Sequence, residues 1–169
     1  MKKLLIKILK KSLGLKSLMH FEGSYVIKVW DKTTGDLIKE YAPIKNLVVS
    51  SPSGYGINLI MRSLGNDSTY PLPITSASIG TGTTAPTLAD TDLQTAVLTG
   101  IVVADRVVLD NAVIISFFIN DSELANGTYT EFGIYSNGRL FARSLIDPVF
   151  VKGSNQNVSV DYTIASVNV

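Results

Sequence analysis

The chain has 169 residues, enough for one domain with its own hydrophobic core. It contains no cysteine, which excludes disulfides, zinc–thiolate sites, iron–sulfur clusters and thiol nucleophiles. Charged residues make up only 17% of it, a composition more typical of a protein covered by partners than of a free enzyme.

Basic residues are concentrated at the N-terminus. Residues 1–20 carry six lysines and no acid, which leaves nine basic against 14 acidic residues over 21–169, a net charge of −5. The sequence therefore predicts two parts, a basic segment over 1–20 and a domain over 21–169. His20, the only histidine, is expected to be a solvated linker residue between them.

The basic segment has helical periodicity. One face holds the apolar residues Leu4, Leu5, Ile8, Leu9, Leu15 and Met19, and the other holds Lys3, Lys7, Lys10 and Lys11. The lysines interrupt every apolar run, which argues against a membrane-spanning helix and against a signal peptide.

Such an amphipathic helix can lie on an anionic membrane, dock in a groove of a partner protein, or pack on its own domain. Nucleic acid is a weaker candidate, because the lysines lack interleaved aromatic residues and the body is acidic. The residues expected to anchor the helix to a partner or a membrane are Lys3, Leu5, Lys7, Ile8, Leu9, Lys10 and Lys11.

From Ser24 onward the apolar periodicity changes to two. Residues 25–30 and 37–41 predict a β-hairpin around Gly35, and residues 55–64 predict a short helix. The helix has apolar residues at 57, 60, 61 and 64, and Gly65 is its expected C-cap. The other expected strands are 46–50, 74–79, 97–103, 106–109, 112–119, 129–136, 139–145 and 157–166.

Turn residues separate these strands, among them Asp105, Asp147-Pro148 and Asn137-Gly138. Asn137-Gly138 is a strong signal for a type I′ hairpin turn, which requires positive φ at both residues. One short helix among many strands predicts a mainly β fold, an antiparallel β-sandwich or jelly-roll-like domain.

The segment ITSASIGTGTTAPTLADTDLQ, residues 74–94, superficially matches the G-x-G-x-x-A fingerprint of a dinucleotide site. That site needs a helix directly after the glycines, whereas here Pro86 follows and the chain beyond residue 96 is β-like. We therefore expect Gly80 and Gly82 to be structural turn residues with positive φ.

Four segments carry a resemblance when taken together. They are KNLVVSS with the helix GINLIMRSL, then ITSASIGTGTTAPTLADTDLQTAV, then YTEFGIYSNGRLFARSLIDPVFV, and finally NVSVDYTIAS. This ensemble, over about residues 24–166, resembles a class of small bacteriophage virion proteins associated with the tail, the tail fibre or the capsid. Members often carry Glu after the DT.L element, where this chain has Gln94. The lysine-rich segment is not a feature of the class.

The resemblance implies a non-enzymatic structural subunit of the virion that binds other virion proteins and forms a homo-oligomer, with a trimer implied by the fibre-like members. Two largely uncharged runs, 97–103 and 112–119, also favour a subunit whose sheets are covered by neighbours. The alternative is a module that binds a glycan or a membrane surface.

Motifs for catalysis are absent from the sequence, and no cofactor or metal is expected. Three acidic pairs, Asp90/Asp92, Asp105/Asp110 and Asp121/Glu123, are candidates for a calcium or glycosidase site, but all lie at expected turns, where aspartate commonly caps backbone amides.

Alternation places Tyr129, Glu131, Gly133 and Tyr135 on one face of their strand. We expect Glu131 to pair with Arg139 or Arg143 of the adjoining strand. If this face is open, Tyr129, Glu131, Tyr135, Arg139 and Arg143 form a sugar-binding or subunit-contact surface.

Overall fold

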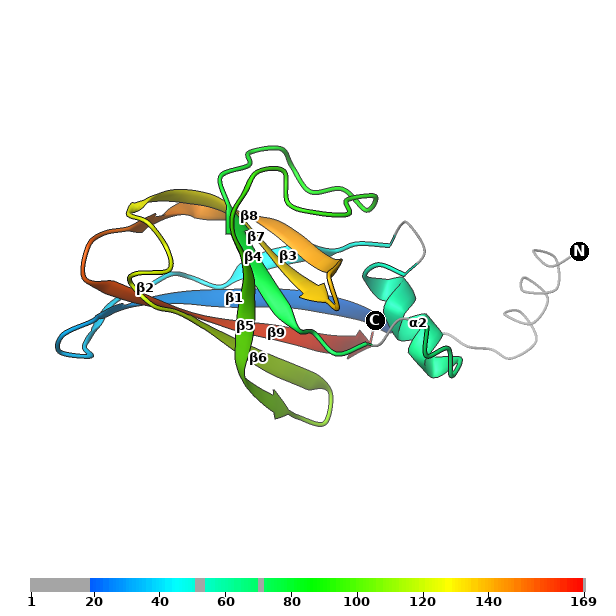
Figure 1. Cartoon of the computed structure of the whole chain (residues 1–169). Helices are drawn as coiled ribbons and strands as arrows, with labels where there is room; N and C mark the ends of the chain where they lie inside the picture. Colours follow the sequence, from blue (N-terminus) through cyan, green and yellow to red (C-terminus); the bar gives the residue numbers. More distant parts are fainter. Residues whose placement is uncertain (1–18, 51–53, 70–71, 169) are drawn as a thin grey trace, which may run out of the picture.

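The computed structural model describes residues 19–50, 54–69 and 72–168 (Figure 1). Residues 1–18, which hold the expected amphipathic helix and its anchor residues, lie outside this range. The elements are β1 (Met19–Asp31), β2 (Leu37–Glu40), β3 (Ile44–Val48), α2 (Ile57–Leu64), β4 (Ser76–Gly80), β5 (Ala96–Val108), β6 (Ala112–Ile119), β7 (Gly127–Ser136), β8 (Arg139–Lys152) and β9 (Gln156–Asn168).

Eight strands close into an antiparallel barrel in the order β1-β3-β8-β7-β4-β5-β6-β9. The ring is closed by β9, which pairs with β1 along its whole length from Met19↔Asn168 to Asp31↔Gln156. The short strand β2 lies outside the ring as the hairpin partner of β1. The mainly β prediction is confirmed, whereas the sandwich or jelly-roll arrangement is wrong, because the first and last strands pair instead of leaving two separate sheets.

Strand β1 begins earlier than expected. Met19 and His20 are its first residues and pair with Asn168 and Val167. Met19 therefore does not extend the amphipathic helix, and the backbone of His20 belongs to the barrel instead of a linker.

Two expected strand breaks are also absent. Strand β5 runs through Asp105, where an irregularity between Val103 and Asp105 accompanies a change of partner from β4 to β6. Strand β8 continues through the cis peptide bond between Asp147 and Pro148. In β5 the extra residue is absorbed as a bulge, which bends a strand without ending it.

The expected hairpins are confirmed. Gly35 (φ 76°), Asn137 (φ 47°) and Gly138 (φ 76°) adopt the left-handed conformation at the two tight turns. Asparagine and glycine enter this region at low cost, so these turns fix the registers of β1–β2 and β7–β8.

The helix α2 is confirmed. Leu59 is its fully buried residue, while Met61 and Leu64 are exposed. Gly65 is the C-cap and donates its amide to the Met61 carbonyl, yet its φ of −83° is ordinary; Asn66 after it is left-handed, with φ 57°.

The barrel interior is rich in aromatic side chains. Tyr25 stacks on Tyr162 and also contacts Phe132, which in turn meets Phe117 edge-on. The Tyr25 hydroxyl is hydrogen-bonded to the Ser144 hydroxyl at 2.7 Å. These rings fill the centre, and the two ends of the barrel are completed differently.

At the end formed by the start of β7 and the end of β8, a lysine side chain is buried. Lys152 Nζ donates to Asp121 Oδ1 at 2.8 Å, and the amide of Gln156 donates to the same oxygen. Lys32 approaches the other carboxylate oxygen. The hydrogen bond from Lys152 and the amide of Gln156 lower the pKa of Asp121 to about 2.

The folded-state pKa of Asp121 lies below the value near 4 of an unfolded aspartate. Its stabilisation is therefore complete above about pH 4 and is lost as the pH falls from about 4 to about 2. We expect Asp121→Asn to flatten this part of the curve of unfolding free energy against pH, measured by urea denaturation. The exposed Asp36→Asn serves as the control. A variant profile as steep as that of the wild type would contradict the assignment.

Candidate functional site

The loop of residues 81–95, which links β4 to β5, lies over the outer face of β7 and β8 (Figure 1). Leu93 packs over Gly133, where an added Cβ would stand 2.9 Å from the leucine Cδ2. The Tyr135 hydroxyl donates to Asp92 Oδ1 at 2.6 Å. The loop thus forms a lid on the wall of the barrel, and the residues singled out in the sequence meet beneath it.

Glu131 of β7 is at the centre of this contact and is completely buried. Its carboxylate accepts hydrogen bonds from the backbone amides of Gly82 (2.9 Å), Gln94 (3.0 Å) and Thr95 (2.6 Å). Because these amides come from both ends of the loop, one side chain joins the loop's beginning to its end.

Arg143 of β8 supplies the opposite charge and is also buried. Its Nε and one terminal nitrogen both lie within 3.0 Å of Glu131 Oε2. The same terminal nitrogen donates to the Thr84 carbonyl, and the other donates to Asp90 Oδ2 at 2.7 Å. Each guanidinium nitrogen therefore has a partner, as the burial of a charge requires.

Asp90 completes the cluster at the surface. Burial raises its pKa, but hydrogen bonds from Thr87 and from Arg143 outweigh that effect, so the pKa is lowered on balance. The Thr87 amide and hydroxyl both donate to this carboxylate. Asp90 thus stays charged opposite Arg143 while it also caps its own turn.

Gln94 has a role that the sequence did not reveal. Its side-chain oxygen accepts the amides of Thr83 and Thr84, each at 2.8 Å. A glutamate at this position would offer the same acceptor, so the amide in this chain makes the contact without adding a second negative charge beside Glu131. The two adjacent threonine amides, which need an acceptor, are the only sequence signal for this role.

Gly80 and Gly82 are structural, but not for the expected reason. The described glycines with positive φ are Gly35, Gly54, Gly56, Gly100 and Gly138, so the positive φ expected at 80 and 82 is wrong. The constraint is close approach. A Cβ on Gly82 would lie 2.4 Å from Glu131 Oε1, and one on Gly80 would lie 2.3 Å from the Thr95 carbonyl oxygen.

These contacts exclude a phosphate site at the glycine turn. A phosphate cradle presents free backbone amides to its ligand. Here the amides of Gly82, Thr83 and Thr84 are bound by the side chains of Glu131 and Gln94. The anion held by the glycine turn is the protein's own carboxylate.

The face expected as a sugar-binding or contact surface is not open. Its members Tyr129, Glu131, Tyr135 and Arg143 are all buried, and only Arg139 is partly exposed, beside the Tyr55 ring. The expected pairing of Glu131 with Arg143 is confirmed. The contact-surface interpretation of this face is wrong. The loop 81–95 covers Glu131 and Arg143 and binds the Tyr135 hydroxyl. Tyr129 instead stacks on Phe150 in the core, because an irregularity between Tyr129 and Glu131 interrupts the expected alternation.

The acidic pairs are also engaged locally. Asp92 accepts from Tyr135, Asp121 from Lys152, Glu123 from Asn120, and Asp105 from the amide of Arg106. Over residues 19–50, 54–69 and 72–168, no three His, Asp or Glu side chains gather as ligands for a metal ion. Within the same ranges, no helix has the length and apolar character to span a bilayer.

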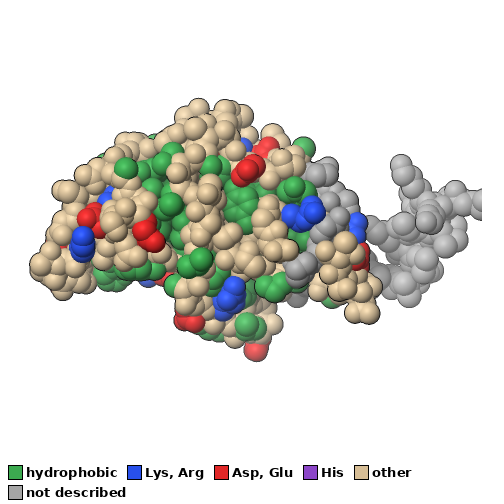
Figure 2. Space-filling model, viewed as in Figure 1, with side chains coloured by type: hydrophobic (Ala, Val, Ile, Leu, Met, Phe, Trp, Pro, Cys, Tyr) green, Lys and Arg blue, Asp and Glu red, His purple; other side chains and the backbone are tan. Residues whose placement is uncertain are grey.

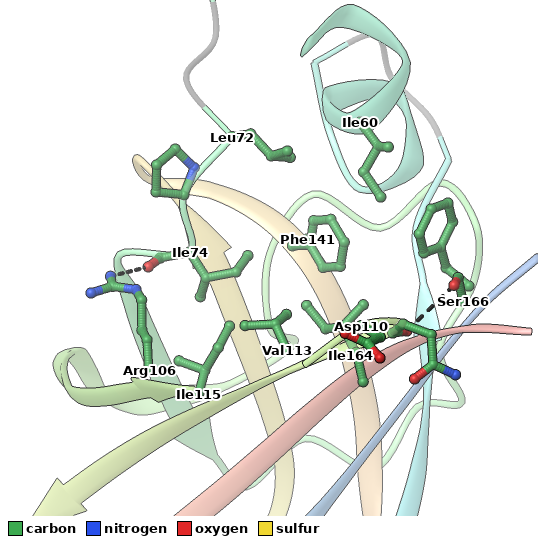
Figure 3. Close-up of a pocket in the computed structure, with 14 residues that line it drawn as sticks. Ile60, Leu72, Ile74, Arg106, Asp110, Val113, Ile115, Phe141, Ile164 and Ser166 are labelled. Carbon is green, nitrogen blue, oxygen red and sulfur yellow. Dashed lines mark hydrogen bonds between the residues drawn. The ribbon is translucent and has the colours of Figure 1, made fainter. Parts of the chain in front are cut away.

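A second feature is a cavity of about 420 Å³ at the barrel end next to α2 (Figure 3). Its walls are mainly apolar, and its labelled lining includes Ile60, Leu72, Ile74, Val113, Ile115, Phe141 and Ile164. Polar side chains lie at its margin, where Arg106 donates to the Ile74 carbonyl at 2.6 Å and Asp110 lies beside Ser166. This is an unfilled apolar space at the mouth of a barrel.

Comparison of the chain with protein-family models, with curated proteins and with solved structures finds no match.

Replacing Glu131 with glutamine keeps its shape but leaves the buried Arg143 without its fully buried counter-charge. We expect Glu131→Gln to lower the free energy of unfolding by about 3–5 kcal/mol, measured by urea denaturation. The exposed Glu40→Gln should change it by less than about 0.5 kcal/mol. A loss below about 1 kcal/mol at Glu131 would mean that Asp90 alone neutralises Arg143.

Adding a methyl group at Gly82 forces it into the Glu131 carboxylate and the Gln94 side chain. We expect Gly82→Ala to destabilise the fold by about 1–3 kcal/mol, as for other overpacked sites. Gly153→Ala is the matched control, because its nearest contacts are 3.4 Å away in the side chain of Gln156. Calorimetric titration of the wild type with ATP should be flat; binding that is lost in Gly82→Ala would restore the phosphate cradle.

Proposed function

We propose that the protein is a non-enzymatic structural subunit of a bacteriophage particle, in the capsid, tail or fibre, that packs against identical copies and other virion proteins. The observation that carries this proposal is the exposed apolar wall of β5. Val97 and Val102 on this strand are 51% and 72% exposed, and Val107 and Val108 are exposed as well.

The composition of β5 supports this interpretation. From Ala96 to Ala104 the strand carries no charged residue, although most of these positions are exposed. Figure 2 shows hydrophobic side chains reaching the surface on the face that carries this strand. Apolar strand surfaces of this kind are aggregation hazards in a free monomer and are suited to burial in an assembly.

The motif residues support a structural role in a second way. The segments that carry the resemblance to virion proteins, GTGTTAP with DTDLQ and EFGIY with LFAR, meet in the lid network of Glu131 and Arg143. The charged groups of Glu131 and Arg143 hold the loop on the barrel. Their hydrogen-bonding atoms are bound within the protein and do not face a substrate. In this chain the segments build the barrel wall, which is consistent with a structural subunit.

The alternative, a glycan-binding module, depended on an open face of Tyr129, Glu131 and Tyr135. Burial of these side chains removes the basis for a glycan-binding module on this face. A closed homo-oligomer, with a trimer as the form implied by fibre-like members of the class, matches one apolar wall per copy, because each copy then buries the same surface.

A charge on the β5 wall should disrupt this assembly without unfolding the barrel. We expect sedimentation equilibrium at micromolar concentration to show an oligomer for the wild type and a monomer for Val102→Glu. Val151→Glu is the matched control, an equally apolar and exposed strand position on β8. Far-UV circular dichroism should be the same for all three, because the barrel stays folded, while the melting temperature of Val102→Glu should no longer depend on protein concentration.

The link to a particle is tested separately. We expect immunogold labelling of purified particles whose genome encodes this chain to show a fixed, symmetric location. A wild-type monomer together with unlabelled particles would overturn the proposal, and dissociation by Val151→Glu but not by Val102→Glu would place the contact elsewhere than β5.

A further inference from the structure

The cavity next to α2 is an incomplete part of the hydrophobic core. Its lining residues Phe21, Ile60, Leu72 and Val113 are only partly buried and pack against the core cluster from outside. At the opposite end of the barrel, by contrast, the buried Lys152 and Asp121 complete the structure. Apolar atoms placed in this open end would gain the dispersion contacts of a protein interior.

The chain itself brings such a segment to this place. Strand β1 begins at Met19, and its third residue, Phe21, is part of the cavity wall. The segment of 18 residues before Met19 therefore joins the barrel beside the opening. As a helix, residues 4–15 would extend about 16 Å, and the three residues 16–18 can bridge up to about 10 Å, which is enough to reverse over the barrel end.

The sequence of that segment matches the cavity in character. Leu5, Ile8 and Leu9 follow one another at helical spacing with lysines on the opposite face. The cavity is apolar inside, and Asp110 lies at its margin (Figure 3). A helix laid across the opening would place leucine and isoleucine in the space and keep its lysines in water or near Asp110.

We infer that residues 1–18 dock on their own barrel, with Leu5, Ile8 and Leu9 inserted in the cavity between α2, β6, β8 and β9. Tethering favours this intramolecular contact, because a short link gives an effective concentration in the millimolar range. The lysines then form a basic surface over the open end of an otherwise acidic body. This inference does not depend on the role in a phage particle.

The absence of cysteine makes a direct test available, because only introduced thiols can react. We would introduce one cysteine in the cavity wall, Ile60→Cys, and pair it in turn with Leu5→Cys, Ile8→Cys or Leu9→Cys in the full chain. Mild oxidation should give an intramolecular disulfide in at least one pair. The control pair, Ile60→Cys with Lys10→Cys, should react on the order of tenfold more slowly, because Lys10 faces away from the cavity.

A second measurement does not require cysteine variants. The triple change Leu5→Ser, Ile8→Ser and Leu9→Ser should lower the melting temperature and raise the fluorescence of the apolar dye ANS several-fold as the cavity opens. The triple change Lys3→Ser, Lys7→Ser and Lys10→Ser should do neither. Both variants keep the whole chain, so a difference between them reports on the apolar face alone.

Three results would overturn the inference. Disulfide-linked dimers in place of intramolecular bonds would show that the segment fills the cavity of a second copy. Disulfide formation no faster than in the Lys10 control would show that the segment lies elsewhere. Disulfide formation and ANS response that differ from the controls only with anionic phospholipid vesicles present would show that the apolar face serves a lipid surface.

Discussion

The buried carboxylate of Glu131 is the constraint on which the rest of the barrel wall depends. A charge without exposure costs several kcal/mol in lost hydration, so its position is tolerable only where donors surround it. The amides of Gly82, Gln94 and Thr95 and the guanidinium of Arg143 provide those donors. Because the amides belong to a long loop, satisfying the charge and ordering the loop are the same event, and the glycines at 80 and 82 follow from the space that it requires.

The pairing of Glu131 with Arg143 could be predicted from the sequence because local rules determine it. The Asn137-Gly138 turn sets the register of β7 with β8, which places Gly133 opposite Arg143 and Glu131 one alternation away on the same face. Nothing local says what covers that face. Alternation distinguishes the two sides of a strand, but the lid comes from a loop about 40 residues earlier. Of the two tyrosines that looked suited to a ligand, Tyr135 binds that loop and Tyr129 packs in the core.

For the same reason, closure of the barrel could not be predicted from the sequence. The strands themselves were predictable, but the pairing of β1 with β9 joins the two ends of the domain, and no short-range pattern encodes it. The helix α2 shows the same limit of prediction from sequence. Its apolar spacing at residues 57, 60, 61 and 64 predicted the helix, but the fully buried residue is Leu59, which lies outside that spacing. Periodicity gives an element's type, and its neighbours decide its face.

Many charged side chains of the barrel are paired with each other, and this limits the number of charges left on its surface. Arg143, Lys152, Asp121 and Glu131 are used internally, and Lys28 is paired with Asp161 on the outer wall. Few charges then remain along β5, where the exposed residues are mostly valine. A chain with low charge content that uses its ions to hold loops and ends in place leaves an apolar strand as its most distinctive exterior. This exposed apolar strand is the feature on which the proposed contact with protein neighbours depends.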